Sequence, residues 1–375
     1  MKKNILYFMP DNPMTGKAGN TTRLNQMLSY FNENENISVQ FVSLKDWGNW
    51  TDEHLKSFKK TYNNVRIQLL NKKYKSTFLK YLFLYKIPYL FKSNKIDITS
   101  LILRRDFNKI IKATKFDAVV ISYALWGKLI DEIPYETYKI LDTHDFITGQ
   151  RKNKHNSIGK LFQDEMEILR SFDEIWTYSV EEQYIFEQFT DRKITLIPVS
   201  FPLNFESTDK SFVYDVIYVA SNNPHNIAGI KWFLKEVLPH LQDVKIHIVG
   251  NICKEIDDYD NVIKHGLVDD LTAMYRSAKI AICPMLSGTG IKIKVVEALS
   301  YGIPVVTNKR GVDGLINKTE NGCIVTDDPK KFAEKMMHLL QNEEFYTKTK
   351  GEAISYFKNN HDPELELELL NTIFK

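Results

Sequence analysis

The sequence predicts an α/β protein of two domains, each built on a parallel sheet covered by helices. Its 375 residues are too many for one ordinary core and fit two domains of typical size. Short runs of β-branched or aromatic residues alternate with helical stretches almost throughout, which is typical of parallel sheets. Between residues 201 and 212 this alternation gives way to proline, asparagine, serine and several charges. We expect the linker between the domains there.

In the first domain, strands and helices alternate from the start of the chain. The opening apolar run predicts a strand and not a targeting peptide, because Asp11 and Asn12 end it early. A helix is expected over Asn20–Phe31. The expected strands are Asn4–Met9, Ile37–Leu44, Asp117–Ser122, Tyr138–Leu141, Glu174–Tyr178 and Ile194–Ile197.

The second domain repeats the pattern and ends in helices. Its expected strands are Asp215–Val219, Lys245–Val249, Ile280–Pro284, Val305–Thr307 and Cys323–Val325. Its expected helices are Asn226–Leu241, Gly290–Ser300 and Lys330–Leu340. The remainder, Asn342–Phe374, has no strand signal and is expected to be helical with a break near Asp362 and Pro363.

Composition and cysteine usage favour a cytoplasmic globular protein. Hydrophobic residues make up 43% and charged residues 26% of the chain, and no uninterrupted apolar run reaches about 18 residues. Cys253, Cys283 and Cys323 are odd in number and lack C-x-x-C spacing. This pattern disfavours a disulfide framework and a zinc site and predicts three reduced thiols.

The net charge of +3 conceals a basic region in the first domain. Lys56–Lys115 holds 16 Lys or Arg and only two acids, a net charge of +14, so the rest of the chain carries −11. Aromatic residues are interleaved with these cations, which favours contact with anionic lipid headgroups or a lipid-linked or polyanionic acceptor. We assign this role to Lys72, Lys73 and Lys75. A solvated pair of amphipathic helices is the open alternative, and no nucleic-acid-binding module is present.

A glycine-rich turn followed by a helix in the second domain indicates an anion site. Gly288 and Gly290 allow positive φ and a close approach of the backbone to a ligand, and the N–H groups of the next helix face the turn. Lys292 and Lys294 are expected in the first helical turn, where a cation is unfavourable unless an anion lies in front of it. We therefore expect a diphosphate, with an ordinary βα turn and solvated lysines as the alternative.

The surrounding residues resemble a known family. Pro284–Pro304, with Glu297 and Gly302, and then Val305–Gly314 resemble the donor-binding signature of the retaining glycosyltransferases of family 4, group 1 glycosyltransferases with the GT-B architecture. The resemblance implies that Glu297 binds the ribose of a nucleotide-sugar. The first glutamate of the family's E-x7-E motif is replaced by Thr289, and the lysine-bearing loop is similar to a variant of the motif.

GT-B proteins have two Rossmann-like domains that face each other across a cleft, with a C-terminal helix that crosses back to the first domain. The resemblance implies an acceptor domain over residues 1–203, a donor domain over 204–355 and a returning helix over 356–375. The residues expected at the donor are Gly16, Gly19, Ser221, Asn222, Asn251, Gly288, Thr289, Gly290, Ile291 and Lys294. A plain βα turn is an alternative interpretation of the two glycines of the first loop.

His144 lies in a polar cluster at the end of an expected strand, where parallel sheets bind ligands. The resemblance implies that this histidine contacts the donor sugar. Asp145 followed by Arg151 also resembles the pattern of a subgroup of this family, and we assign Arg151 to the acceptor side. The alternative is a histidine that is satisfied by Asp142 or Asp145.

No metal site is expected. Asp257, Asp258 and Asp260 form a polar loop without a supporting ligand, which favours a solvated turn. The resemblance implies that helix dipoles and cations such as Lys292 take the place of a metal at the diphosphate.

Together these features predict a metal-independent retaining glycosyltransferase that uses no cofactor and takes a UDP- or GDP-linked sugar. His144, Lys292 and Glu297 are its expected catalytic residues. The expected acceptor is a glycan, a lipid-linked molecule or a protein in bacterial surface polysaccharide or glycoconjugate synthesis, with the enzyme in the cytoplasm or peripheral at the inner face of the plasma membrane. The alternative is a noncatalytic GT-B subunit that binds an acceptor or a partner glycosyltransferase, because the first glutamate is missing.

Overall fold

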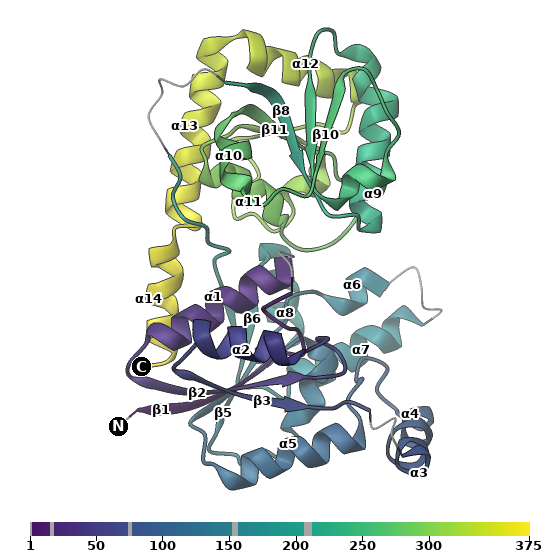
Figure 1. The fold of residues 1–375 in the computed structure, drawn as a ribbon, viewed down its shortest axis with the longest axis vertical. Helices are drawn as coiled ribbons and strands as arrows, with labels where there is room; N and C mark the ends of the chain where they lie inside the picture. Colours follow the sequence, from purple (N-terminus) through teal and green to yellow (C-terminus); the bar gives the residue numbers. More distant parts are fainter. Residues whose placement is uncertain (1, 16–18, 74–76, 152–156, 206–211) are drawn as a thin grey trace. The chain divides into compact units, whose positions relative to one another are not determined.

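The structure is a computed structural model that describes residues 2–15, 19–73, 77–151, 157–205 and 212–375. Its contacts divide the chain into two compact units. The first unit comprises Met1–Thr177, Glu182–Ile197 and Asn371–Lys375, and the second comprises Tyr178–Glu181 and Pro198–Leu370. Both are α/β units with parallel sheets, which confirms the predicted class (Figure 1).

The first unit is built on a seven-stranded parallel sheet in the order β3-β2-β1-β4-β5-β6-β7. The strands are β1 Lys3–Phe8, β2 Ile37–Leu44, β3 Val65–Leu70, β4 Ala118–Ser122, β5 Tyr138–Asp142, β6 Glu174–Thr177 and β7 Lys193–Leu196. The sequence predicts six of them. The exception, β3, pairs only with β2 at the edge of the sheet, and its exposed polar residues Arg66 and Gln68 obscure the apolar pattern.

Helices cover both faces of this sheet. The main ones are α1 Gly19–Glu33, α2 Asp52–Thr61, α5 Leu101–Ala113, α6 Ile147–Arg151, α7 Ile158–Leu169 and α8 Val180–Phe189. In Figure 1, α1 and α2 lie over one face of the sheet and α5 over the other. The α2 start is fixed because the Thr51 side chain accepts a hydrogen bond from the His54 N–H, with Asp52 and Glu53 at the positive end of the helix dipole.

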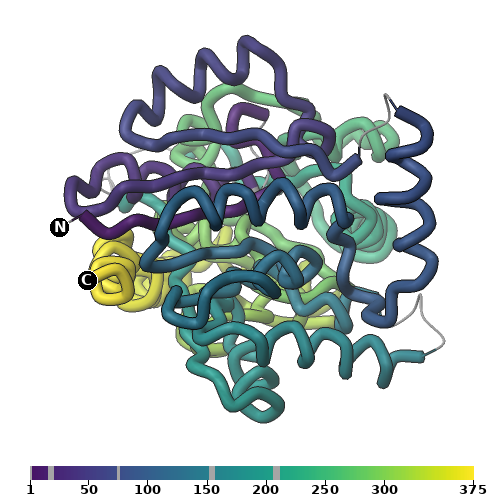
Figure 2. The backbone as a smooth tube through the Cα atoms, turned by 90° about the horizontal axis from the view of Figure 1, so that it is seen from below, coloured from purple at the N-terminus to yellow at the C-terminus, as the bar shows by residue number. Residues whose placement is uncertain are grey.

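A further helix lies at the margin of the first unit. It runs without interruption from α3 Phe78–Tyr81 through a π-helical turn, Leu82–Lys86, into α4 Ile87–Leu90. Figure 2 shows it in dark blue along one side of the tube. We call Phe78–Phe91 the edge helix below.

The second unit is built on a six-stranded parallel sheet in the order β10-β9-β8-β11-β12-β13. The strands are β8 Tyr214–Val219, β9 Ile246–Val249, β10 Val262–Gly266, β11 Ala278–Cys283, β12 Val305–Thr307 and β13 Cys323–Val325. Its helices include α9 Pro224–Trp232, α10 Leu271–Arg276, α11 Ile293–Ser300 and α12 Pro329–Gln341. The predicted helix after β8 is present, but its second half is a π turn, Phe233–Val237, and a 3-10 turn, Leu238–His240.

The last helices are α13 Glu343–Asn360 and α14 Pro363–Ile373, so the break at Asp362 is confirmed. The boundary expected after residue 355 falls inside α13, because this helix continues to Asn360. Residues 371–375 belong to the first unit, where the Phe374 ring packs 5.4 Å from the Phe31 ring and 6.0 Å from the Trp176 ring.

Among the described residues, no helix combines the length and apolar character that a bilayer crossing requires. Cys253, Cys283 and Cys323 are free thiols, and the latter two are buried.

Candidate functional site

The strand order of the second unit marks the place of a ligand site. β8 is the first strand of this unit, and it has β9 on one side and β11 on the other. The chain therefore reverses its winding direction at β8, and loops that leave the carboxyl ends of neighbouring strands diverge there. Such reversal points are where parallel α/β sheets bind ligands.

The glycine turn that leaves β11 has the backbone conformation expected from its sequence. Gly288 and Gly290 have φ values of 105° and 69°, in the left-handed region that glycine adopts without a steric penalty. The helix after the turn, α11, begins at Ile293 and not at Gly290 as predicted. The turn is consequently longer, and Ile291 belongs to it.

Two other glycines pack closely against this loop. A Cβ on Gly229, in α9, would lie 1.8 Å from the Pro284 carbonyl oxygen, and a Cβ on Gly314 would lie 2.6 Å from the Cα of Ile291. Both close contacts are possible only because glycine has no side chain. The turn is therefore fixed in place by close packing of backbone against backbone.

Lys292 occupies the N-cap position of α11 and not the first helical turn, where the sequence places it. Its side chain is buried with only 6% exposure, and its ammonium group donates hydrogen bonds to the carbonyl oxygens of Gly290 at 2.6 Å and Thr289 at 3.3 Å. A positive charge is thus held against the turn, beside the N-terminal end of a helix.

Lys294 lies two residues further along, in the first turn of α11, and its side chain reaches α9. Its ammonium group donates a hydrogen bond to the side-chain oxygen of Asn226 and lies 5.1 Å from the centre of the Tyr218 ring. Burial lowers the pKa of Lys294. The Asn226 amide in turn donates to the Ser221 carbonyl at 2.9 Å, so the contact links the loops after β8 and β11.

Two buried hydroxyl groups in this region have no hydrogen-bond partner among the described residues: those of Thr289 and Tyr218. Thr289 belongs to the turn, and the Tyr218 ring lies under Lys294. Buried hydroxyls are normally paired, so these two are candidates for bonds to a bound ligand.

The other predicted donor residues of the second unit lie at the same edge of the sheet. Ser221 and Asn222 follow β8, just before α9, and His225 of α9 shares a 2.7 Å hydrogen bond with Ser287 of the turn. Asn251 follows β9, after Gly250, whose φ of 109° brings its backbone against the Ala220 carbonyl. The structure therefore groups the residues that the sequence assigns to the donor on this unit.

Glu297 lies in the second turn of α11 and contacts Tyr275, a partner that the sequence did not indicate. Its carboxylate accepts a 3.1 Å hydrogen bond from the Tyr275 hydroxyl, and the Tyr275 ring stacks on Tyr301 at 5.0 Å. Burial raises the pKa of Tyr275, and the charge of Glu297 raises it further. The tyrosine stays a donor and fixes the direction of the carboxylate.

In the first unit, His144 follows β5 and stacks on Tyr123, which follows β4. Their ring centroids are 4.3 Å apart, and both residues have positive φ, 59° and 66°. The imidazole Nε2 lies 3.1 Å from Oδ2 of the buried Asp142, the partner in the alternative interpretation of this histidine. Two adjacent strained residues at strand ends are typical of functional sites, because other contacts must hold them there.

Buried carboxylates fix the start of α6 behind His144. Glu165 accepts hydrogen bonds from the Ile147 and Thr148 N–H groups, and Glu182 accepts one from the Phe146 N–H. Burial, and then the charge of Asp145, raise the pKa of Glu182 to about 8. Arg151 ends this short helix, and its charge opposes the pKa rise that burial causes at Glu165.

The assignment of Lys72 to a lipid or acceptor surface requires a correction. Lys72 is buried with 8% exposure, and its ammonium group lies 5.2 Å from the Trp47 ring and 5.0 Å from the Trp126 ring. It is not a surface charge, because the two rings cover it. Lys73 is partly buried and lies over the Tyr85 ring at 5.0 Å.

Two predicted residues, Gly16 and Lys75, lie outside the described residues. Gly19 is the first residue of α1, so this helix begins one residue earlier than expected and includes Gly19. Over the described ranges, no group of three or more His, Cys, Asp or Glu has a metal-binding arrangement. Asp258 of the acidic loop pairs with Lys264.

Comparison with known proteins finds a family match within the second unit. A family model described as glycosyl transferases group 1 matches residues 214–342, which include the glycine turn, both lysines and Glu297. Residues 214–342 thus match the group 1 glycosyltransferases. We refer to them as the group 1 domain.

Two curated relatives match part of the chain. An uncharacterized 44.6 kDa protein in the cps region of Klebsiella pneumoniae is 27% identical over 196 residues, which cover 48% of this chain and 50% of that protein. Spore coat protein SA of Bacillus subtilis is 28% identical over 123 residues, which cover 31% of this chain and 30% of that protein. The matched stretches thus span half or less of these relatives.

Solved structures match the whole chain in fold. Sucrose-phosphate synthase from Thermosynechococcus elongatus has a TM-score of 0.74 at 13% identity and covers 100% of this chain and 98% of its own. Anabaena Alr3699/HepE in complex with UDP has a TM-score of 0.70 at 11% identity, and the match covers 99% of each chain. TarM has a TM-score of 0.69 at 15% identity, and the match covers 100% of this chain and 99% of the TarM chain. These likenesses confirm the predicted GT-B fold.

Proposed function

We propose that the chain is a glycosyltransferase of the retaining type that moves a sugar from a nucleotide diphosphate to an acceptor, with the donor bound by the group 1 domain. The observation that carries the proposal is the position of Lys292, whose buried ammonium group is held at 2.6 Å from the Gly290 carbonyl at the start of α11. A cation and a helix N-terminus at one turn form a strong binding site for a diphosphate.

The chemistry is stabilisation of the leaving group. As the bond between sugar and diphosphate breaks, negative charge grows on the diphosphate, and donors already oriented toward it lower the barrier. Lys292 supplies charge, the turn supplies backbone N–H groups, and the buried Thr289 hydroxyl is a further donor in the position of the missing glutamate. Metal independence and membership of family 4 are part of this proposal.

Glu297 and His144 would orient the donor. Glu297 would accept hydrogen bonds from the ribose hydroxyls, and Tyr275 supports this role because it fixes the carboxylate direction. His144 would contact the transferred sugar, and its stacking on Tyr123 limits the rotation of the imidazole. Their predicted roles come from the resemblance.

The relatives support a proposal for the pathway and for the donor. One relative is encoded in a cps region and another is a spore coat protein, which supports a role in bacterial surface polysaccharide or glycoconjugate synthesis. One solved structure with the same fold, Anabaena Alr3699/HepE, is a complex with UDP-glucose. We therefore expect a UDP-linked sugar first and a GDP-linked sugar second.

A thermal-shift screen with UDP, GDP, ADP and their sugars tests this proposal. A ligand at 100 times its dissociation constant stabilises the folded chain by roughly 2.7 kcal/mol, which gives a clear rise in the unfolding temperature. UDP release from the stabilising donor, with and without EDTA, then measures turnover and metal dependence. If no nucleotide-sugar binds or is hydrolysed, and Glu297→Ala preserves the cellular role, the noncatalytic subunit is the correct alternative.

A further inference from the structure

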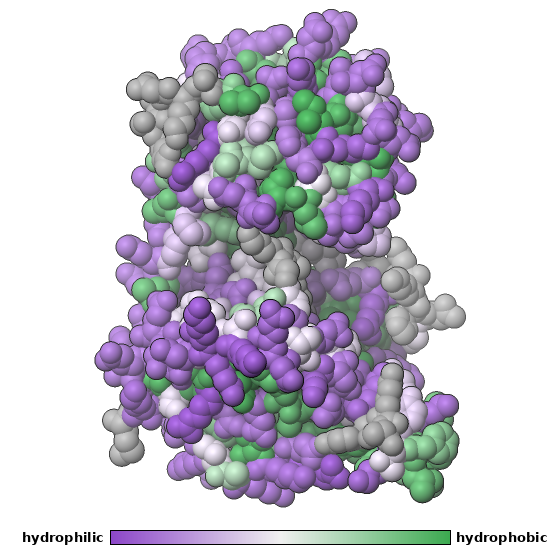
Figure 3. Space-filling view, viewed as in Figure 1, coloured by the Kyte–Doolittle hydropathy of each residue, from purple (hydrophilic) through white to green (hydrophobic). Residues whose placement is uncertain are grey.

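The edge helix, Phe78–Phe91, exposes apolar side chains along its length. No residue of α3, the π turn or α4 is buried. Five large apolar side chains are mostly in solvent: Phe78 (71% exposed), Leu79 (63%), Phe83 (59%), Leu90 (74%) and Phe91 (81%). Figure 3 shows hydrophobic atoms gathered where Figure 1 places α3 and α4. Contiguous exposed apolar side chains of this size mark an interaction surface.

The neighbouring helix α5 shows how an ordinary amphipathic helix of this unit behaves. It buries Ile102, Leu103, Phe107 and Ile110 in the core, and Ser100 caps its start. The edge helix contributes no residue to that core cluster. Its five exposed apolar side chains therefore add little to the packing of the unit, and their exposure needs another explanation.

A row of tyrosines forms a second side of the edge helix. Tyr81, Tyr85 and Tyr89 stack at centroid distances of 5.3 and 6.1 Å. The ammonium group of Lys73 lies 5.0 Å from the Tyr85 ring, and that of Lys92 lies 5.6 Å from the Tyr89 ring. Tyrosine and lysine side chains, apolar along their stems and polar at their tips, are typical of the boundary between lipid and water.

The segment that contains the edge helix carries charge of one sign in its sequence. Residues 71–96 include seven lysines and no acid. Three of these lysines, Lys80, Lys86 and Lys95, are exposed. A partner of complementary charge is therefore anionic.

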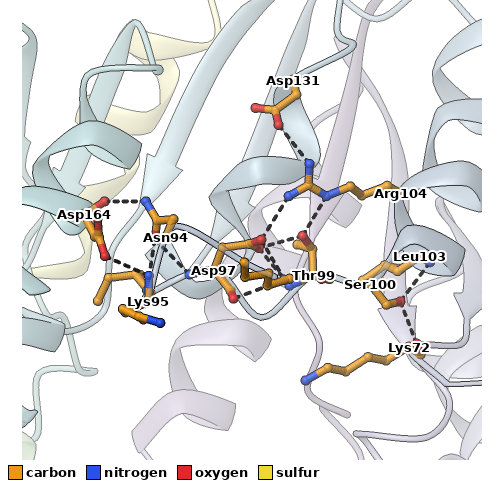
Figure 4. Close-up of polar contacts among 12 residues, drawn as sticks. Lys72, Asn94, Lys95, Asp97, Thr99, Ser100, Leu103, Arg104, Asp131 and Asp164 are labelled. Carbon is orange, nitrogen blue, oxygen red and sulfur yellow. Dashed lines mark hydrogen bonds and ion pairs between the residues drawn. The ribbon is translucent and has the colours of Figure 1, made fainter. Parts of the chain in front are cut away.

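Polar contacts of the flanking segments hold the edge helix on the unit. On its C-terminal side, Lys92 pairs with Asp97 at 2.7 Å, and Arg104 binds the same carboxylate at 3.0 Å (Figure 4). Asn94 and Lys95 are tied to Asp164 at 3.0 and 2.8 Å.

The N-terminal side is held in the same manner. The Lys72 N–H donates to Asp46 at 2.9 Å, and the Lys72 carbonyl accepts from the Ser100 hydroxyl at 2.6 Å. These polar contacts thus fix the segments on both sides of the edge helix, while its apolar side chains stay exposed.

We propose that the edge helix lies in the interface of an anionic phospholipid bilayer, with the five exposed apolar side chains among the acyl chains and Lys80, Lys86 and Lys95 at the headgroups. The helical residues 78–90 extend about 20 Å, so the helix is too short to span a core of about 30 Å and lies in the plane of the membrane. This inference goes beyond the proposed transfer reaction and does not depend on it.

A lipid surface fits better than a protein groove or a second copy of the chain. The tyrosine row and the lysines match the depth profile of a membrane interface, and the apolar residues are large and flexible enough to enter fluid acyl chains. A second copy would present the same positive charge, and like charges repel.

Co-sedimentation with vesicles of phosphatidylcholine, with and without phosphatidylglycerol, tests the inference. The unmodified chain is expected to bind the vesicles that contain phosphatidylglycerol. The triple variant L79S/F83S/L90S is expected to bind at least about tenfold more weakly, because it loses most of the inserted apolar surface. Tyr135→Ser is the matched control, since it removes a 93% exposed aromatic ring of the same unit outside the edge helix. Circular dichroism and the unfolding temperature verify that both variants fold.

Two further measurements separate insertion from simple charge attraction. Lys80→Gln with Lys86→Gln is expected to weaken binding at low salt and to matter less at high salt, where headgroup attraction is screened. In Phe83→Trp, the added fluorescence, taken as the difference from the unmodified chain, is expected to shift to the blue when phosphatidylglycerol vesicles are added.

Three results would overturn the inference. They are full vesicle binding by the triple variant, an unshifted added fluorescence in vesicle-bound Phe83→Trp, and absence of vesicle binding by the unmodified chain. If the triple variant instead abolishes concentration-dependent self-association in sedimentation, the surface is an interface between copies and the lipid assignment is wrong.

Discussion

The side-chain oxygen of Asn226 accepts a hydrogen bond from the ammonium group of Lys294, and this contact joins the first turns of α9 and α11. The two helices follow different strands of the group 1 domain and start at the same edge of its sheet. Their N-terminal ends are thereby held together by a contact between protein side chains. An anion at this edge would meet two helix dipoles and two lysines.

Asn226→Ala is expected to destabilise the chain by about 1–3 kcal/mol, because it removes the acceptor of a buried ammonium group. Urea unfolding measures the change, and the same variant is expected to bind nucleotide diphosphates more weakly. Asn317→Ala, which truncates an exposed asparagine of the same unit, is the control and should leave both quantities unchanged. Equal stability of the two variants would contradict the role that we give to this contact.

Gly229→Ala is expected to destabilise the chain by about 1–3 kcal/mol or more, because the new methyl group would press against the Pro284 carbonyl and displace the glycine turn. Gly351→Ala is the matched control. It also replaces a helical glycine, but its Cβ would meet nothing within 4 Å, so it should stabilise by up to about 1 kcal/mol through helix propensity. Denaturant unfolding of both variants gives the comparison, and a stabilising Gly229→Ala would show that the turn is not clamped.

Stability is expected to fall between about pH 5 and pH 8, partly because of Glu182. Its pKa rises from 4.5 to about 8 on folding. In this range the folded chain binds a proton that the unfolded chain has released, so a rise in pH favours unfolding. Glu182→Gln should flatten the slope of unfolding free energy against pH, while Glu187→Gln, an exposed position on the same helix, should retain it. Glu165 has a raised pKa as well, so a smaller slope should remain.

Lys292→Met is expected to lower kcat for donor hydrolysis by roughly 10²- to 10³-fold, with a smaller effect on KM, if its charge acts mainly on the departing diphosphate. Steady-state release of the nucleotide diphosphate measures both constants. Lys309→Met, which changes an exposed lysine of the same unit, is the control. A change confined to KM would assign Lys292 to ground-state binding only.

The sequence is sufficient for the strand pattern and for the glycine turn, because both are local properties. A buried parallel strand is a short run of β-branched or aromatic residues, and Gly288 and Gly290 provide the positive φ values that the turn uses. The sequence places the start of α11 three residues too early. Lys292 is an unusual N-cap without a capping side chain, so no local signal marks the boundary.

The sequence does not predict which residues contact the site residues. Tyr275 is 22 positions from Glu297 and Asn226 is 68 positions from Lys294, so the fold alone brings them together. The surface role predicted for Lys72 is wrong for the same reason. Its neighbours in sequence are basic and polar, and only the tertiary packing of Trp47 and Trp126 removes it from the surface.

The place of Phe374 has a consequence for synthesis. Its ring completes an aromatic group with Tyr30, Phe31 and Trp176, all of which leave the ribosome more than half a chain earlier. During translation the part of these three rings that Phe374 covers stays exposed until the entire group 1 domain has emerged. A nascent chain that stops before α14 would thus lack this apolar cover, and the final residues complete the packing of the first unit.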